Sequence, residues 1–164
     1  MIQLFHGSDM SVENPKVEAG RAKVDFGRGF YLSSLLNQAK SWAKVIASRT
    51  RHGKPVLNCY DFDEEMAKNI SGARYKVFKS YDMDWLNYVI DCRRGGELQL
   101  QYDVVEGGVA NDNVIDTVED YENGIITAEQ ALGQLVYKNV NHQICIRSQK
   151  VVDACLKFTG SEIL

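Results

Sequence analysis

Short apolar segments recur along this chain without a regular alternation of strands and helices. Strand-like segments are expected at residues 2–6, 29–33, 56–62, 98–105, 143–146 and 156–159. Helices are expected from Ser34 to Gly53, from Asp84 to Cys92, and after the starts at Thr127 and Ser148. Strands and helices mixed in this order predict an α+β domain.

Size and composition are those of one ordinary globular domain. The chain has 164 residues, of which 45% are hydrophobic and 25% charged, so we expect a single domain over residues 1–164. The net charge of -3 argues against a general electrostatic grip on nucleic acid.

Cysteine usage and hydropathy bear on the compartment. The four cysteines form no C-x-x-C pair and lie mostly among apolar neighbours, which favours buried free thiols over disulfides or zinc ligands. The sequence does not start with basic residues followed by an apolar run, so we expect no signal peptide. No segment approaches the ~20 apolar residues that are needed to span a bilayer. We therefore expect a cytoplasmic protein that does not contact the membrane.

Three motifs near the start of the chain combine glycine with aromatic and polar side chains. They are Leu4-Phe5-His6-Gly7-Ser8, then Asp25-Phe26-Gly27-Arg28-Gly29-Phe30-Tyr31-Leu32-Ser33, then Gln38-Ala39-Lys40-Ser41-Trp42. Glycine has no Cβ, so the flat or phosphorylated parts of a ligand can lie against bare backbone. Together the motifs indicate a nucleotide-like ligand with an aromatic amide, such as NAD.

In these motifs the chain resembles the NAD-binding half of the ADP-ribosyltransferase superfamily. The similarity is to the clade with a His-Tyr-Glu triad, which includes diphtheria toxin and the poly(ADP-ribose) polymerases. Over nearly its whole length the sequence also resembles the bacterial domain-of-unknown-function family 3990, with Asp103-Val104-Val105-x-Gly-x-Val109-Ala110 among the shared features. The resemblance implies an α+β fold of the split β-sandwich type with flanking helices.

The resemblance also implies a role for each matching residue. His6 would hydrogen-bond a ribose hydroxyl of NAD, and the backbone of Gly7 would hold the nicotinamide amide. Tyr31 would stack on the nicotinamide ring, with Trp42 as a second stacking aromatic. The remaining residues implied to contact NAD are Ser8, Gly29 and Gln38.

At one position on the expected helix the chain departs from this pattern. Polymerase-like members often carry a serine that bonds the nicotinamide amide, and here the residue is Ala39. Gln38 or Ser41, on either side of it, is the alternative for that contact.

The larger departure is at the third position of the triad. In the resembled clade a glutamate stabilises the positive charge that develops on the ribose, but the matching residue here is Gln143. Glutamine can hydrogen-bond a hydroxyl, yet it is neutral and cannot act as a base. Poly(ADP-ribose) elongation is therefore not expected. Glu106 or Asp103 is the alternative source of the missing charge.

Other polar residues have structural interpretations. His52 and His142 lack metal-ligand spacing and are expected at the surface or behind the site. The acidic cluster over residues 61–65 is expected to be a solvated helix N-terminus, where carboxylates oppose the helix dipole. No metal site is expected.

Two functions follow from the resemblance. The first is a mono-ADP-ribosyltransferase that uses NAD as substrate, with His6, Tyr31 and Gln143 as its catalytic residues. Its acceptor would be a protein or nucleic acid, and as a toxin or effector it would have a neutralising antitoxin partner. The second is a catalytically inactive module that binds NAD or another protein.

Overall fold

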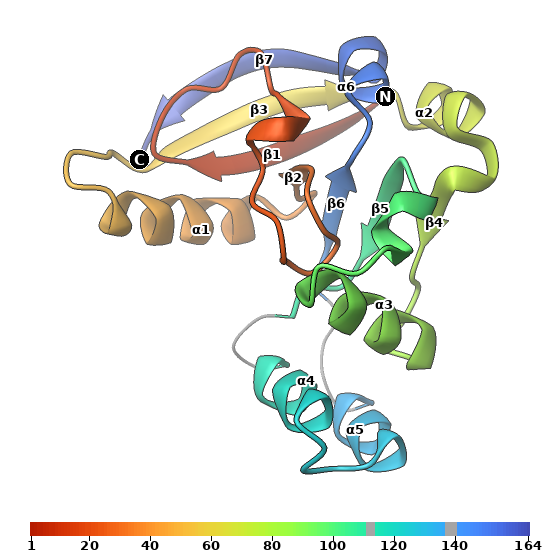
Figure 1. The fold of residues 1–164 in the computed structure, drawn as a ribbon. Helices are drawn as coiled ribbons and strands as arrows, with labels where there is room; N and C mark the ends of the chain where they lie inside the picture. The colour runs from red at the N-terminus through yellow and green to blue at the C-terminus, as the bar shows by residue number, and fades with distance from the viewer. Residues whose placement is uncertain (111–113, 137–140) are drawn as a thin grey trace.

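The computed structural model describes residues 1–110, 114–136 and 141–164, which form two β-sheets with flanking helices (Figure 1). The three-stranded sheet has the order β1 (Ile2–Ser8), β3 (Val56–Phe62) and β7 (Leu156–Ile163). The four-stranded sheet has the order β2 (Phe30–Leu32), β6 (Gln143–Ile146), β5 (Val104–Gly107) and β4 (Tyr75–Val77). All paired strands are antiparallel except β4 and β5. The predicted α+β class is confirmed.

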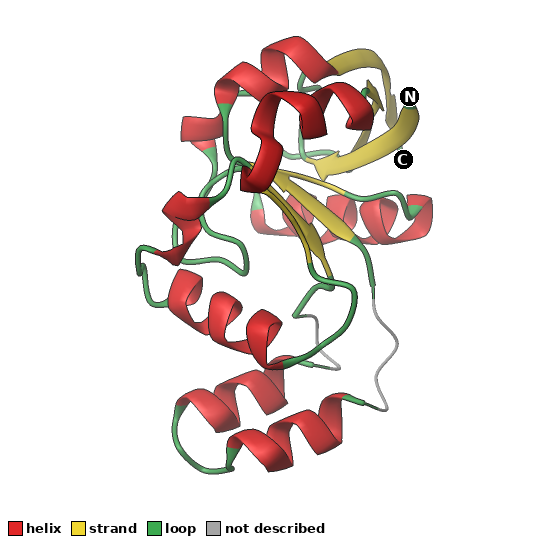
Figure 2. Cartoon of the chain, turned by 90° about the vertical axis from the view of Figure 1, so that its right-hand side faces the viewer, coloured by secondary structure: helices red, strands yellow, loops and turns green. Residues whose placement is uncertain are grey.

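Helices cover the sheets from several sides. Helix α1 (Leu36–Arg49) packs on β1, whereas α4 (Ile115–Glu122) and α5 (Ala128–Leu135) lie side by side below α3 (Met83–Arg93) (Figures 1 and 2). The other helices are α2 (Glu64–Ser71) and α6 (Gln149–Cys155), with 3-10 turns at Val17–Ala19, Gly72–Arg74 and Leu98–Gln101. Within the described ranges, no helix has both the length and the hydropathy to cross a membrane.

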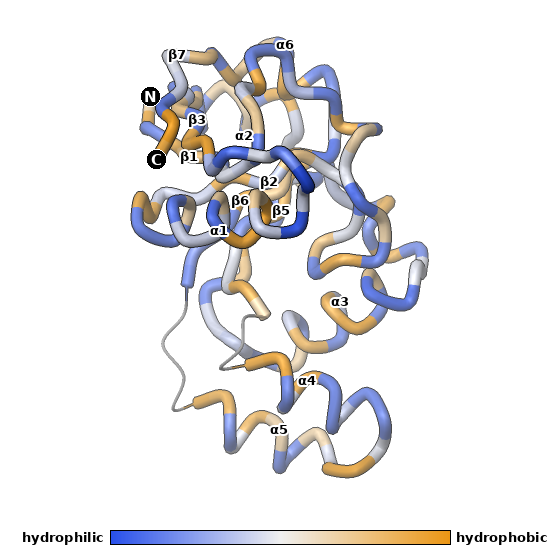
Figure 3. Tube along the Cα trace, turned by 90° about the vertical axis from the view of Figure 1, so that its left-hand side faces the viewer, coloured by the Kyte–Doolittle hydropathy of each residue, from blue (hydrophilic) through white to orange (hydrophobic). Residues whose placement is uncertain are grey.

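Both faces of the four-stranded sheet are buried, which explains the uninterrupted apolar run along β6. One face packs against the three-stranded sheet through Leu4, Phe30, Leu32, Tyr60, Phe62, Val104, Ile144 and Ile146. The other face packs against α3, α4 and α5 through Trp85, Leu86, Val105, Val118, Leu135 and Cys145. Hydrophobic residues of these three helices are orange in Figure 3. Each such side chain contributes about 1.5–3 kcal/mol when fully buried, so both faces hold the sheet in place.

Two predicted helix starts are confirmed by their capping contacts. The Thr127 hydroxyl accepts the Gln130 N–H at 3.2 Å, and the Gln130 side chain accepts the Thr127 N–H at 2.9 Å. In the acidic cluster, the Asp63 carboxylate accepts the Met66 N–H at 2.9 Å and begins α2. The four cysteines are free, as expected.

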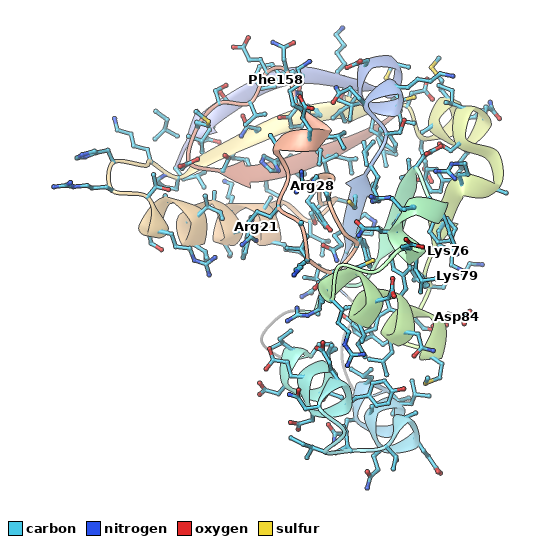
Figure 4. The ribbon with its side chains drawn as sticks, in the orientation of Figure 1. Arg21, Arg28, Lys76, Lys79, Asp84 and Phe158 are labelled. Carbon is cyan, nitrogen blue, oxygen red and sulfur yellow. The ribbon has the colours of Figure 1, made fainter. Side chains whose placement is uncertain are left out.

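Two other predictions about secondary structure were wrong. Helix α3 is capped by Asp82, which accepts the Trp85 N–H at 2.9 Å, and not by Asp84, which points outward (Figure 4). Residues 98–105 are not one strand, because a 3-10 turn occupies Leu98–Gln101 and strand β5 begins at Val104. The Leu98 N–H donates to the Asp91 carboxylate at 2.9 Å, so this segment satisfies its backbone outside the sheet.

Candidate functional site

The outer edge of β1 presents the backbone groups of Gly7. Phe5 and Ser33 exchange two backbone hydrogen bonds, of 2.8 and 2.9 Å, so the edge of β1 that faces away from β3 is used at Phe5. Backbone groups two residues apart on a strand project to the same side, so the N–H and C=O of Gly7 project from this edge as well. Within the described part of the chain, neither group has a backbone partner outside β1 and β3. One donor and one acceptor therefore lie side by side on this edge, on a residue that is itself buried.

Helix α1 packs so closely on this part of β1 that only glycine fits. A Cβ at Gly7 would lie 2.2 Å from the Ala39 carbonyl oxygen and 2.6 Å from the Ala43 nitrogen. Real Cβ atoms do not approach backbone atoms to these distances. Helix α1 can therefore pack this closely on β1 only because residue 7 has no side chain. Ala39 thus contacts Gly7 through its backbone, while its small buried side chain fits the same interface.

His6 is held in one orientation and one tautomer. Its Nδ1 lies 2.7 Å from the Tyr31 carbonyl oxygen, and since a carbonyl only accepts, Nδ1 carries the proton. Burial lowers the pKa of His6, against a smaller opposing effect of this hydrogen bond. The imidazole is therefore neutral at pH 7, and its Nε2 has an available lone pair. The ring is also packed against Phe30, with centroids 4.5 Å apart.

Tyr31 is fixed by the loop that precedes β2. Its hydroxyl donates to the Gly27 carbonyl at 2.6 Å and accepts the Phe26 N–H at 3.0 Å. Gly27 has φ +77°, a conformation that glycine adopts at little cost and that lets the loop curl around the hydroxyl. Burial raises the pKa of Tyr31 well above its usual value, so the phenol stays protonated.

Gln143 lies on the same face of the four-stranded sheet as Tyr31, because it is two residues before Cys145, the strand partner of Tyr31. Its side chain is buried, and the amide nitrogen donates to the Gly108 carbonyl at 3.3 Å. The amide also lowers the pKa of the Asp25 carboxyl, as the smallest of the effects that act on that pKa. Since these two neighbours only accept, the amide nitrogen faces both, and the amide oxygen faces away from them.

Asp25 is the residue of this site that the sequence reasoning missed. Its carboxylate accepts the Ala110 N–H at 2.8 Å and pairs with Arg93 at 3.3 Å. Burial raises the pKa of Asp25, and the contacts with Ala110, Arg93 and Gln143 oppose that rise. Its place at the start of the glycine-rich motif was the only sequence signal. The negative charge next to Gln143 therefore comes from Asp25, in the loop that precedes β2.

The two acids considered as alternatives lie elsewhere. Asp103 pairs with Arg74 at 2.9 Å. Glu106 is opposite Ile144 on β6, so its side chain is on the face opposite that of Gln143. Neither acid is placed beside Gln143.

The other candidate residues are spread around this centre. Trp42 on α1 is 41% exposed, and the Arg49 guanidinium carbon lies 5.7 Å from its ring centroid. Gln38 donates to the His142 carbonyl at 2.8 Å, which occupies its amide nitrogen. A Cβ at Gly29 would lie 2.5 Å from the Cys145 sulfur, so this glycine serves close packing. The remaining candidate, Ser8, has its hydroxyl 3.4 Å from the Asp9 carboxylate.

Two surface hollows lie away from His6, Tyr31 and Gln143. A hollow of about 480 Å³ lies between Arg28 and Arg147, and one of about 350 Å³ lies beside His52 and Ser161; none of His6, Tyr31 or Gln143 lines either of them. Over the residues that the structure describes, no group of three or more His, Cys, Asp or Glu side chains could hold a metal ion.

Comparison with known proteins gives a family match. The family model "Protein of unknown function (DUF3990)" matches residues 2–158, nearly the whole chain. No curated protein and no solved structure matches. By this match, the chain belongs to the DUF3990 family of proteins of unknown function.

Proposed function

We propose that the protein binds NAD at the outer edge of β1, in a split β-sandwich of the ADP-ribosyltransferase type. The observation that carries the proposal is the free N–H and C=O pair of Gly7, next to the neutral ring of His6. A primary carboxamide such as that of nicotinamide has an acceptor oxygen and a donor nitrogen side by side. It can therefore make two hydrogen bonds with the backbone of one residue.

In this proposal, three further side chains would contact the rest of the ligand. Nε2 of His6 can accept a hydrogen bond from a ribose hydroxyl, because Nδ1 already holds the ring proton. The Gln143 amide oxygen can accept from a second hydroxyl, because the amide nitrogen is turned toward Gly108 and Asp25. The ring of Tyr31, fixed at its hydroxyl, offers an aromatic face to nicotinamide.

The proposed reaction is transfer of a single ADP-ribose to a macromolecular acceptor. Nicotinamide leaves with the electrons of its bond to the ribose, and a nucleophilic group of the acceptor bonds to the same ribose carbon. No free carboxylate is added by Asp25, because Arg93 neutralises its charge. That pairing also favours the second candidate function, an NAD-binding module without turnover. Release of free nicotinamide from NAD, measured with and without cell extract as a source of acceptor, separates the two.

The binding proposal predicts stabilisation by the ligand. NAD at 100 times its dissociation constant should stabilise the fold by about 2.7 kcal/mol, seen as a concentration-dependent rise in Tm. His6→Ala should lose most of that rise, because it removes the ribose contact. His52→Ala changes an exposed histidine and is the matched control, with the wild-type response. Equal responses in the His6→Ala variant and the wild type would contradict the assignment of this edge.

A toxin role and a neutralising partner are part of the same proposal. An enzyme that consumes NAD or modifies an essential target harms the cell that makes it. Expression of the chain alone in bacteria should then slow growth, whereas the His6→Ala variant should be tolerated. Growth curves that coincide for the two chains would exclude this role while leaving NAD binding intact.

A further inference from the structure

Four polar side chains form a continuous hydrogen-bonded row across the four-stranded sheet. Ser34 follows β2, His142 precedes β6, Glu106 lies in β5 and Tyr75 in β4, so the row follows the order of the strands. The Ser34 hydroxyl lies 2.9 Å from Nδ1 of His142, and Nε2 of His142 lies 3.0 Å from the Glu106 carboxylate. Tyr75 donates to the second oxygen of that carboxylate at 3.2 Å. Ser34, at the outer end, is exposed.

Neighbouring groups determine where the protons lie along this row. The Ser34 backbone N–H donates to Nδ1 of His142 at 3.2 Å, so Nδ1 carries the lone pair and Nε2 carries the proton. The Ser34 hydroxyl therefore donates to Nδ1, and Nε2–H donates to Glu106. The hydrogen bond from His142 lowers the pKa of Glu106, so this carboxylate is ionised at pH 7. The basic Nδ1 of His142 thus faces Ser34, and the Glu106 carboxylate contacts the other nitrogen of the same imidazole ring.

The serine and the base are held by the same segment of chain. Ser33, next to Ser34, donates from its hydroxyl to the His142 carbonyl at 2.9 Å. Gln38, in the first turn of α1, donates to the same carbonyl at 2.8 Å. The position of His142 relative to Ser34 is therefore set by two further contacts, as in sites where a nucleophile, its base and an orienting acid act together.

We propose that Ser34 is the nucleophile of a second site, which takes short apolar acyl groups from carboxylic esters. Its acid, Glu106, lies on the face of the four-stranded sheet opposite Gln143. Leu35 and Leu36, the next two residues, are 43% and 39% exposed and offer apolar surface to the acyl group. The serine also lies at a strand-to-helix turn, and α1 begins without a side-chain cap, so amides of its first turn are available to the acyl oxygen.

In the reaction, the Ser34 oxygen bonds to the acyl carbon while its proton passes to Nδ1 of His142. Glu106 stabilises the imidazolium that forms. The bond from the acyl carbon to the alcohol oxygen then breaks, and the alcohol leaves with the proton from His142. Water attacks the acyl-serine and gives a proton to His142, and the Ser34 oxygen leaves and takes that proton back. The products are one carboxylic acid and one alcohol.

Labelling with a fluorophosphonate probe, followed by mapping of the modified peptide, tests the proposal without NAD. We expect wild-type protein to be labelled at Ser34 and to hydrolyse 4-nitrophenyl butyrate. Ser34→Ala should abolish both signals, and His142→Ala should slow labelling by about 100-fold through loss of the general base. Ser48→Ala changes a serine that lies within α1 and donates to the Val45 carbonyl, and it should behave like the wild type.

Thermal denaturation of each variant shows whether it is folded, and Glu106→Gln provides a second, milder variant if His142→Ala unfolds. Labelling of wild type no faster than of Ser34→Ala would overturn the proposal. So would labelling at Ser34 that is equally fast in folded His142→Ala or Glu106→Gln protein.

Discussion

Replacing Gln143 with glutamate should destabilise the protein by about 3 kcal/mol at pH 7, the cost of an uncompensated buried charge. The amide of Gln143 donates toward the Gly108 carbonyl and the Asp25 carboxylate, and its side chain is buried. A glutamate would face these two acceptors with a third and place a second carboxylate beside Asp25. Urea denaturation of wild type and variant measures the difference. A loss below about 1 kcal/mol would show that the two side chains do not interact.

Asp25→Asn combined with Gln143→Glu should recover most of this loss. The exchange keeps one carboxylate and one amide in contact but moves the carboxylate to β6, so the double-mutant cycle should give a coupling of about 2 kcal/mol. If NAD binds as proposed, the negative charge now lies where the ribose becomes positive, and nicotinamide release should rise by about two to three powers of ten. Asp25→Asn alone is the control, since it removes the acid without restoring one. Recovered stability without faster release would contradict the NAD assignment and leave the pairing intact.

Replacing Gly7 with alanine should cost about 3 kcal/mol, the upper end of what an inserted methyl group typically costs in a packed interior. The new Cβ would meet backbone atoms of Ala39 and Ala43, so α1 as a whole must move away from β1. The same shift would disturb the edge at which NAD is proposed to bind, so the response of Tm to NAD should vanish as well.

Gly133→Ala provides the matched control for this change. Gly133 is an exposed residue of α5, and a Cβ there would meet nothing within 4 Å. Alanine is the better helix former by about 1 kcal/mol, so this variant should be as stable as the wild type or more stable. Urea denaturation of both variants gives the comparison. Equal stabilities for Gly7→Ala and wild type would mean that α1 is not packed against Gly7 as described.

The parts of the fold that the sequence predicted are those set by local signals. The capping box at Thr127 and the apolar alternation from Val56 to Phe62 depend on residues a few positions apart, and the start of α5 and both ends of β3 were predicted correctly. Residues 98–105 misled the prediction because their apolar pattern resembles a strand. Their backbone is instead satisfied by side chains of Asp91 and Arg147 from other elements.

In the candidate site, too, the residues marked by local patterns were predicted, and the contacts between distant residues were not. His6, Gly7 and Tyr31 could be proposed because a strand end beside glycine is visible in the sequence. The contact of Asp25 with Gln143 joins residues 118 positions apart, and that of Ser34 with His142 joins residues 108 apart. No pattern among neighbouring residues of the sequence predicts contacts between residues so far apart. They arise only when β2, β5 and β6 are brought into one sheet.

The position of β3 at the centre of its sheet has a consequence for the order of folding. β1 and β3 can pair as soon as both are synthesised. The other edge of β3 can pair only after the synthesis of β7, which comes about a hundred residues later in the chain. Until then β3 has an unpaired edge, and pairing with another chain competes with pairing to β7. A growing chain stalled before residue 156 should therefore depend on chaperones far more than the finished protein does.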